Sequence, residues 1–131
     1  MNFTLSELIR SDTAIRYKMY NMPKTEEVLD NMFYLITECL QPIRDYVKKP
    51  IIISSGYRCP ELNSRIGGVS TSQHTKGQAA DFIIQGLSVN QAIELIKKSG
   101  IKYDQLINEY DKWVHISYNK KGNRQQCFKI T

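Results

Sequence analysis

The chain has 131 residues, of which 41% are hydrophobic and 24% are charged, a composition that is ordinary for one globular domain with its own core. Its formal net charge of +5 favours an anionic partner, and nucleic acid, an anionic membrane and an anionic cell wall all fit on charge alone. Lysines on solvent-exposed faces explain the same charge without any partner.

The cysteines and the N-terminus bear on the compartment. Cys39, Cys59 and Cys127 are an odd number without a CxxC spacing, which argues against a disulfide framework or a structural zinc cluster. We expect reduced thiols, with one bridge to Cys127 as the alternative. No basic segment followed by an apolar run opens the chain, and no run approaches the roughly 20 apolar residues of a membrane span. We therefore expect synthesis in the cytoplasm without a signal peptide, and no membrane insertion.

The first part of the chain is predicted to be helical. Apolar residues at roughly helical spacing predict one or two short helices within residues 3–20. The clearest helix follows Thr25, which can cap it, and its apolar stripe runs from Val28 to Val47. Leu29, Phe33, Leu35 and Leu40 are expected to widen this stripe into the main wall of the core. Pro42 is expected to kink the helix or to mark its last turns.

The rest of the chain predicts short strands with two further helices. A β-branched run predicts a buried strand at residues 51–55. Further elements are expected as two helical turns at 60–66, a polar loop at 67–78, a strand ending at 81–84, a helix from Ser88 to Gly100, a hairpin of 104–110 with 113–118, and a strand at 126–130. Helices near the N-terminus and strands near the C-terminus indicate an α+β fold, with a small antiparallel sheet packed with N-terminal helices.

The sequence contains two histidines, and both lie near possible metal-ligating partners. His74 is in the polar loop, Asp81 follows seven residues later, and His115 is in the predicted hairpin. Two imidazoles and one carboxylate are the ligand set of an open catalytic zinc site, in which water holds the fourth position. A lone histidine in a strand is more often structural. Here the whole histidine complement falls next to suitable partners, which favours a metal.

Three segments resemble a known family. They are Ser-Gly-Tyr-Arg at 55–58, Ser72-x-His74-x-x-Gly77-x-Ala79-x-Asp81, and Trp113-x-His115. They resemble the zinc D-Ala-D-Ala carboxypeptidases, a family that includes vancomycin-resistance dipeptidases and phage endolysin peptidases and shares its fold with the hedgehog signalling domain. Residues 5–11 and the closing hairpin also resemble short phage and bacterial members. The resemblance implies a hedgehog/DD-peptidase fold and a single zinc peptidase domain over residues 1–131.

The resemblance also implies roles for individual residues. His74, Asp81 and His115 would bind Zn²⁺, which lowers the pKa of a bound water and polarises the scissile carbonyl. Arg58 matches the family arginine that contacts the substrate and stabilises the developing tetrahedral intermediate. Ser72 matches a serine that contacts the substrate. Without the resemblance, a surface salt bridge for Arg58 and a loop hydrogen bond for Ser72 are the better interpretations.

The general base is where this sequence departs from the family pattern. Many relatives carry Glu or Asp three residues before the second histidine, where this chain has Lys112. Lysine cannot take a proton from the attacking water and hand it to the leaving amine as a carboxylate does. Glu109 and Asp111 are the nearby candidates. A loop with an odd number of residues puts Glu109 on the face of His115 and an even loop does not; we prefer Glu109.

These observations favour a zinc-dependent peptidase that hydrolyses peptidoglycan stem or cross-bridge peptides, as a D-Ala-D-Ala carboxypeptidase or an endolysin-like endopeptidase does. We expect a monomer that acts on the bacterial cell wall, for example as a phage lysin released by a partner. The alternative is a catalytically silent, zinc-containing cell-wall-binding module, which Lys112 leaves open. A nucleic-acid-binding protein is disfavoured, because the basic residues are dispersed and no recognised binding motif occurs.

Overall fold

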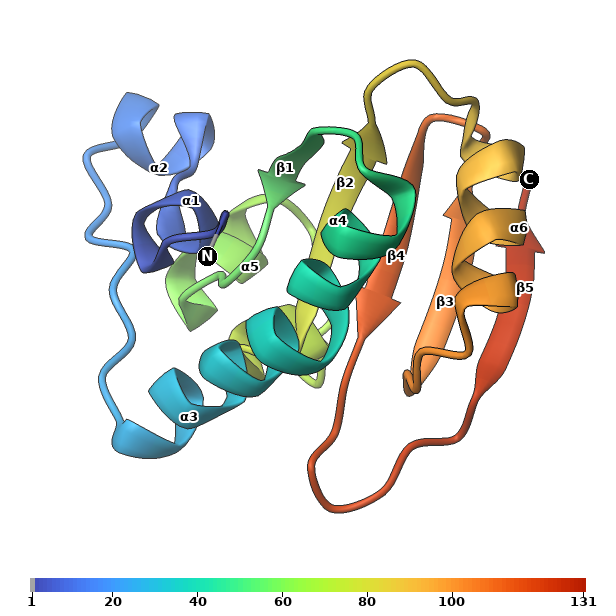
Figure 1. Cartoon of the computed structure of the whole chain (residues 1–131). Helices are drawn as coiled ribbons and strands as arrows, with labels where there is room; N and C mark the ends of the chain where they lie inside the picture. The colour runs from blue at the N-terminus through green and yellow to red at the C-terminus, as the bar shows by residue number, and fades with distance from the viewer. Residues whose placement is uncertain (1) are drawn as a thin grey trace.

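A computed structural model describes residues 2–131. Its centre is a five-stranded sheet with the order β1-β2-β4-β3-β5, shown in Figure 1. The strands are β1 (Ile51–Ser55), β2 (Ala79–Ile84), β3 (Gln105–Glu109), β4 (Trp113–Ser117) and β5 (Gln126–Ile130). The helical elements are α1 (Leu5–Ile9), α2 (Asp12–Arg16), α3 (Glu26–Leu35), the π-helix η1 (Ile36–Leu40), α4 (Gln41–Val47), α5 (Pro60–Arg65), the 3₁₀ turn η2 (Gln73–Lys76) and α6 (Val89–Ser99).

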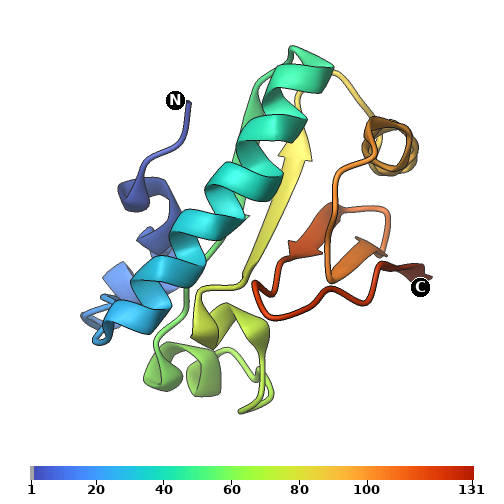
Figure 2. The ribbon, with the colours of Figure 1, turned by 60° about the horizontal axis from the view of Figure 1, so that its bottom comes forward.

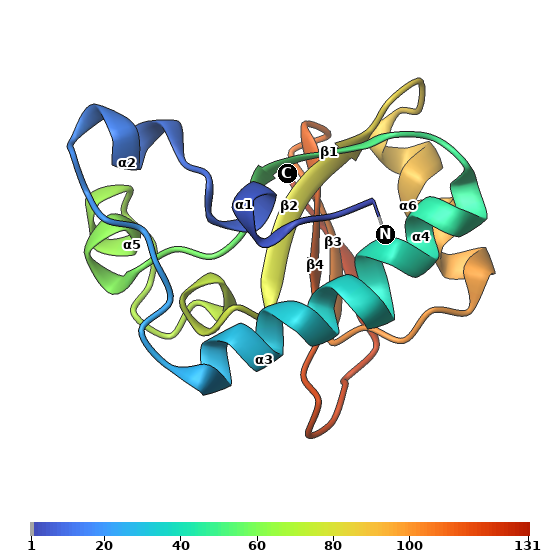
Figure 3. The same ribbon diagram turned by 60° about the vertical axis from the view of Figure 1, so that its left-hand side comes forward.

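Helices lie on both sides of the strands. Figure 3 shows α4 and α6 on one side of β1 and β2, and α2 and α5 on the other. The fully buried strand residues on the side of α4 and α6 form the core with the long helix; they include Phe82, Leu106, Val114 and Ile116. The predicted α+β class is confirmed. The remaining side chains of β2 and β4 point away from this core, because successive residues of a strand face opposite sides.

The long helix forms as predicted, with one local change. Thr25 caps it, since its side chain accepts a hydrogen bond from the backbone N–H of Val28. The helix then continues through α3, η1 and α4. The π-helix ends just before Pro42, which has no N–H to donate and whose ring needs a wider preceding turn. Leu29 and Phe33, which we expected in the apolar stripe, are exposed, so the buried stripe is narrower than predicted.

Two features of the sheet differ from the sequence-based expectation. Strand β5 pairs with β3 in parallel, whereas the other three pairings are antiparallel. Both edges of β4 are already taken by β2 and β3, so the chain leaving β4 cannot form a hairpin with it and instead pairs at the outer edge of β3, where it runs parallel. Strand β1 is an edge strand and not a buried one, since Ile52 and Ser54 are exposed.

All three cysteines are free, with Cys39 and Cys59 buried and Cys127 exposed. Burial raises the pKa of the Cys39 thiol, which donates a hydrogen bond to the carbonyl of Lys102. Within residues 2–131, every helix is too short or too polar to cross a bilayer.

Candidate metal centre and active site

Strand register brings two of the predicted metal ligands together. Asp81 of β2 pairs directly with His115 of β4, and both are nearly buried, with 8% of each residue exposed. Their neighbours Phe82 and Val114, also a cross-strand pair, face the core. Successive side chains of a strand face opposite sides of the sheet. Asp81 and His115 therefore both point away from the core, on the same side of the sheet.

The third predicted ligand comes from η2, which Figure 2 shows beside the start of β2 and next to α5. The hydroxyl of Ser72 caps this turn by accepting a hydrogen bond from the N–H of His74 at 3.2 Å. Gly77 ends it with a φ of +73°, a conformation that favours glycine. A Cβ at Gly77 would also lie 2.7 Å from the carbonyl oxygen of Val28. The loop is thus packed tightly enough to hold His74, which is 3% exposed.

A backbone carbonyl fixes the orientation of the His74 ring. Nδ1 lies 2.7 Å from the carbonyl oxygen of Gly56. A carbonyl can only accept, so Nδ1 carries the proton and Nε2 has a free lone pair in the neutral ring. Histidines that bind metals are commonly oriented in this way by a group behind them.

The geometry of the three side chains fits a small divalent cation. His74 Nε2 and His115 Nδ1 lie 3.3 Å and 2.9 Å from the same oxygen, Oδ1 of Asp81. The three ligand atoms all lie within 4.8 Å of one another. For bonds of about 2.0–2.1 Å, two ligand atoms of a tetrahedral ion are roughly 3.3 Å apart. Nitrogen and carboxylate oxygen donors at this spacing match a three-ligand site with an open position.

The charge of the group also suits a cation. Burial on its own raises the pKa of Asp81, but the neighbouring imidazoles of His115 and His74 outweigh it, so the net effect holds the pKa below its usual range. Asp81 is therefore ionised at neutral pH. One buried negative charge between two imidazoles can offset part of the charge of a divalent ion.

Glu109 and Asp111 lie on opposite sides of the sheet. Residues 110–112 form the loop, and Glu109 pairs with Trp113, so the odd-numbered loop is confirmed. Glu109 Oε1 lies 3.6 Å from His115 Nδ1. The carboxylate of Asp111 instead accepts a hydrogen bond from Asn108 at 2.9 Å and lies 3.1 Å from Lys129 Nζ. Asn108 also contacts Asn90 of α6, so the structure brings Glu109, and not Asp111, to the histidines.

Arg58 lies beside the group as well. Its backbone N–H donates to the carbonyl of His74 at 3.0 Å, and its Nη1 donates to Asn63. Its Nε is buried and has no hydrogen-bond partner among residues 2–131. Burial lowers the pKa of the guanidinium, and the negative charges of Asp81 and Glu109 oppose that shift. No ion pair within the described chain involves Arg58, so the surface salt bridge that we considered does not form.

Two buried polar groups near the site were not found from the sequence. Asp104, whose side chain is 4% exposed, accepts hydrogen bonds from the Nε and Nη2 of Arg124 and from Gln73 Nε2, all at 2.8–2.9 Å. Asp104 thereby connects the loop that precedes β5 to η2, the turn that carries His74. Trp113 has a buried indole N–H without a partner in residues 2–131. Asp104 is the first residue of the predicted hairpin segment 104–110, and nothing in the sequence indicated that its side chain is buried.

Replacing Asp104 with Asn is expected to lower the free energy of unfolding by about 2 kcal/mol, since charged hydrogen bonds contribute about 1.5–3 kcal/mol. The bonds to Arg124 outweigh burial and lower the pKa of Asp104 to about 2. The stabilisation is therefore full above about pH 4 and is lost as the pH falls through about 2. Denaturant titration near pH 7 and near pH 2 measures it. A deficit of equal size at both pH values would contradict this account.

Fold and donor set together are those of a metallopeptidase. The chain belongs to the Peptidase M15 family, whose family model matches residues 1–117. This confirms the family resemblance. Over 77 residues, the chain is 34% identical to the peptidoglycan L,D-endopeptidase MepK of Escherichia coli (strain K12), and to the proteins of that name from Escherichia coli O157:H7 and Shigella flexneri. The match covers 53% of this chain and 40% of each relative.

Proposed function

We propose that this chain is a zinc-dependent peptidase that hydrolyses peptide bonds in peptidoglycan stem or cross-bridge peptides, with residues 1–131 forming one catalytic domain. The observation that carries the proposal is the convergence of His74, Asp81 and His115 within 4.8 Å, with the Glu109 carboxylate beside them. Membership of the Peptidase M15 family supports the reaction. The printed name of the matched relatives supports the substrate.

Zinc is the metal that the donor set favours. Two imidazole nitrogens and one carboxylate oxygen are a common ligand set of catalytic zinc, whereas magnesium and calcium prefer oxygen ligands. When bound, the ion activates a water molecule and polarises the scissile carbonyl. The hydrogen bond from His74 to Gly56 keeps the ring in the tautomer that can bind it.

Three further side chains have proposed roles in the reaction. Glu109 accepts the proton of the attacking water and delivers it to the leaving amine. The Arg58 guanidinium stabilises the negative charge that develops on the carbonyl oxygen, and its unpartnered Nε is available for that purpose. Ser72 contacts the substrate next to His74. Its hydroxyl already accepts a hydrogen bond from the His74 N–H, and its proton is free to be donated outward.

The proposed site of action is the bacterial cell wall. The net charge of +5 favours association with an anionic wall. A phage lysin is one kind of protein with this substrate and charge. We propose that the protein acts there as a monomer, which sedimentation of the zinc-loaded protein can test.

Digestion of purified muropeptides tests the proposal. We expect the zinc-loaded protein to release new amino and carboxyl termini, chelation to stop the reaction, and added zinc to restore it. Mass spectrometry of the products identifies the bond, because loss of one terminal D-alanine indicates a carboxypeptidase and internal cleavage an endopeptidase. Stoichiometric zinc and bound peptidoglycan without any cleavage would instead support the silent binding module.

A further inference from the structure

A second feature lies next to Arg58. A pocket of about 230 Å³ opens between the α1–α2 connection, the end of β1 and α5. Its charged lining residues are Arg10, Asp12 and Arg58, and the hydroxyl groups of Ser11, Ser54 and Ser55 are among its other polar groups. A neighbouring hollow of about 180 Å³ shares Arg10, Asp12 and Ser54 with it and continues along β1. None of the roles proposed above uses Arg10 or this pocket as a whole.

Residues at one wall of the pocket form hydrogen bonds with two of the predicted metal ligands, Asp81 and His74. The Ser54 hydroxyl donates to the backbone carbonyl of Asp81 at 3.3 Å. Two residues on, the Gly56 carbonyl accepts from His74 Nδ1, and the Arg58 N–H donates to the His74 carbonyl. A Cβ on Gly56 would lie 2.4 Å from the carbonyl oxygen of Leu8, so α1 packs tightly against this segment. A peptide held at the metal centre therefore has the pocket within reach of its neighbouring residues.

The charged side chains that line the pocket indicate which kind of ligand it can bind. The charged groups that line the pocket are two guanidinium groups, those of Arg10 and Arg58, and one carboxylate, that of Asp12. Arg10 Nη2 lies 3.4 Å from Asp12 Oδ1, but the two side chains are 74% and 87% exposed. An ion pair this exposed contributes little and exchanges readily for another partner. The pocket thus offers the Arg10 guanidinium to an anion.

We propose that this pocket is a subsite for a free carboxylate of the substrate peptide, held by Arg10 at the rim, while Arg58 keeps the role at the scissile carbonyl proposed above. The planar donor fork of arginine matches a carboxylate with two parallel hydrogen bonds. The inference rests on the proposed peptidase function and makes Arg10 a specificity-determining residue. Stem peptides offer two such groups, the α-carboxylate that a γ-linked D-Glu leaves free and the C-terminal carboxylate.

Substrate analogues with one amidated carboxylate test the subsite. The probes are L-Ala-γ-D-Glu-L-Lys-D-Ala-D-Ala and two analogues, amidated either at D-Glu or at the C-terminus. For the unmodified peptide, Arg10→Gln should raise KM about tenfold and leave kcat nearly unchanged, as loss of one charged hydrogen bond implies. The effect should vanish for the analogue in which the recognised carboxylate is an amide, and that analogue identifies the source.

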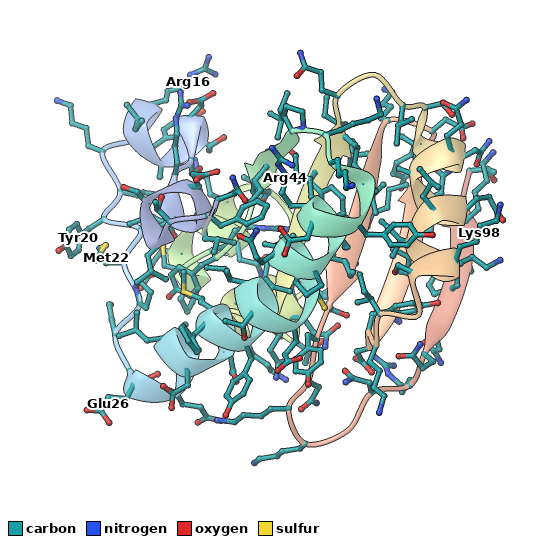
Figure 4. All side chains as sticks on the ribbon, viewed as in Figure 1. Arg16, Tyr20, Met22, Glu26, Arg44 and Lys98 are labelled. Atoms are coloured by element: carbon teal, nitrogen blue, oxygen red, sulfur yellow. The ribbon has the colours of Figure 1, made fainter. Side chains whose placement is uncertain are left out.

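Arg16→Gln is the matched control. Arg16 is at the end of α2, outside the pocket lining, and Figure 4 shows it projecting outward. This variant removes the same charge and should leave KM unchanged. An equal rise in KM for both variants would show a general electrostatic effect and overturn the subsite. The melting temperature of Arg10→Gln should match that of the wild type, because the Arg10–Asp12 pair is exposed.

Failure of the subsite can be told apart from failure of the peptidase function. If the zinc-loaded wild type cleaves none of the three peptides, the proposed function is wrong. Cleavage by the wild type with an Arg10→Gln effect that is absent, or is equal on all three peptides, overturns the subsite alone. Calorimetric titration of Glu109→Gln protein with the unmodified peptide gives a readout besides turnover, and adding Arg10→Gln should weaken that binding about tenfold.

Discussion

Replacing Asp81 with Ala is expected to abolish stoichiometric zinc binding and, with it, hydrolysis. Asp81 Oδ1 is the atom that both His74 Nε2 and His115 Nδ1 approach, and it supplies the only negative charge of the three-residue group. Changes in groups that merely support a metal ligand cost about 10–100-fold in affinity. Removing a ligand itself should therefore weaken zinc binding by more than about 100-fold.

Elemental analysis after dialysis, together with competition against a chromophoric chelator, measures the loss. Asp81→Asn keeps the shape and a hydrogen-bond acceptor but removes the charge, so it should fold normally and still bind zinc poorly. Asp30→Ala removes an exposed carboxylate from α3 and is the control for net charge. An Asp81→Ala protein that retains one zinc per chain with wild-type affinity would disprove the proposed metal centre.

Local chemistry explains why much of the fold could be predicted from the sequence. Thr25 caps the start of a helix, Gly100 ends another, and a β-branched run forms β1. Each of these effects depends only on residues a few positions away in the sequence. The pairing of Glu109 with Trp113 depended only on the number of loop residues. Because strand side chains alternate, that number also set the face that Glu109 occupies.

Long-range contacts explain what could not be predicted. The parallel pairing of β5 follows from which strand edges are already taken, and this depends on the whole sheet order. The same order leaves β1 at an edge and exposes Ile52. The bond from Gln73 to Asp104 joins residues 31 positions apart, and neither residue differs locally from an ordinary polar loop residue. Predicting the metal ligands was easier because the histidines are so few.

Glu109→Gln is expected to lower kcat by about 10²- to 10⁴-fold, the usual contribution of a general base, while zinc binding is retained. Glutamine has nearly the same shape and cannot accept the proton of the attacking water. Asp111→Asn is the matched control, because it makes the same acid-to-amide change in the adjoining loop. Its carboxylate is engaged by Asn108 and Lys129, so this variant should keep turnover close to that of the wild type.

Measuring turnover and zinc content on the same samples separates two possible roles of Glu109. Its Oε1 is 3.6 Å from His115 Nδ1, close enough either to transfer protons at the reaction centre or to support the histidine as a ligand. Low turnover with full zinc identifies a general base, whereas parallel loss of both identifies a supporting group. Full turnover in Glu109→Gln would exclude the assignment. Lys112 could not then replace it, because a protonated ammonium has no lone pair with which to accept the proton.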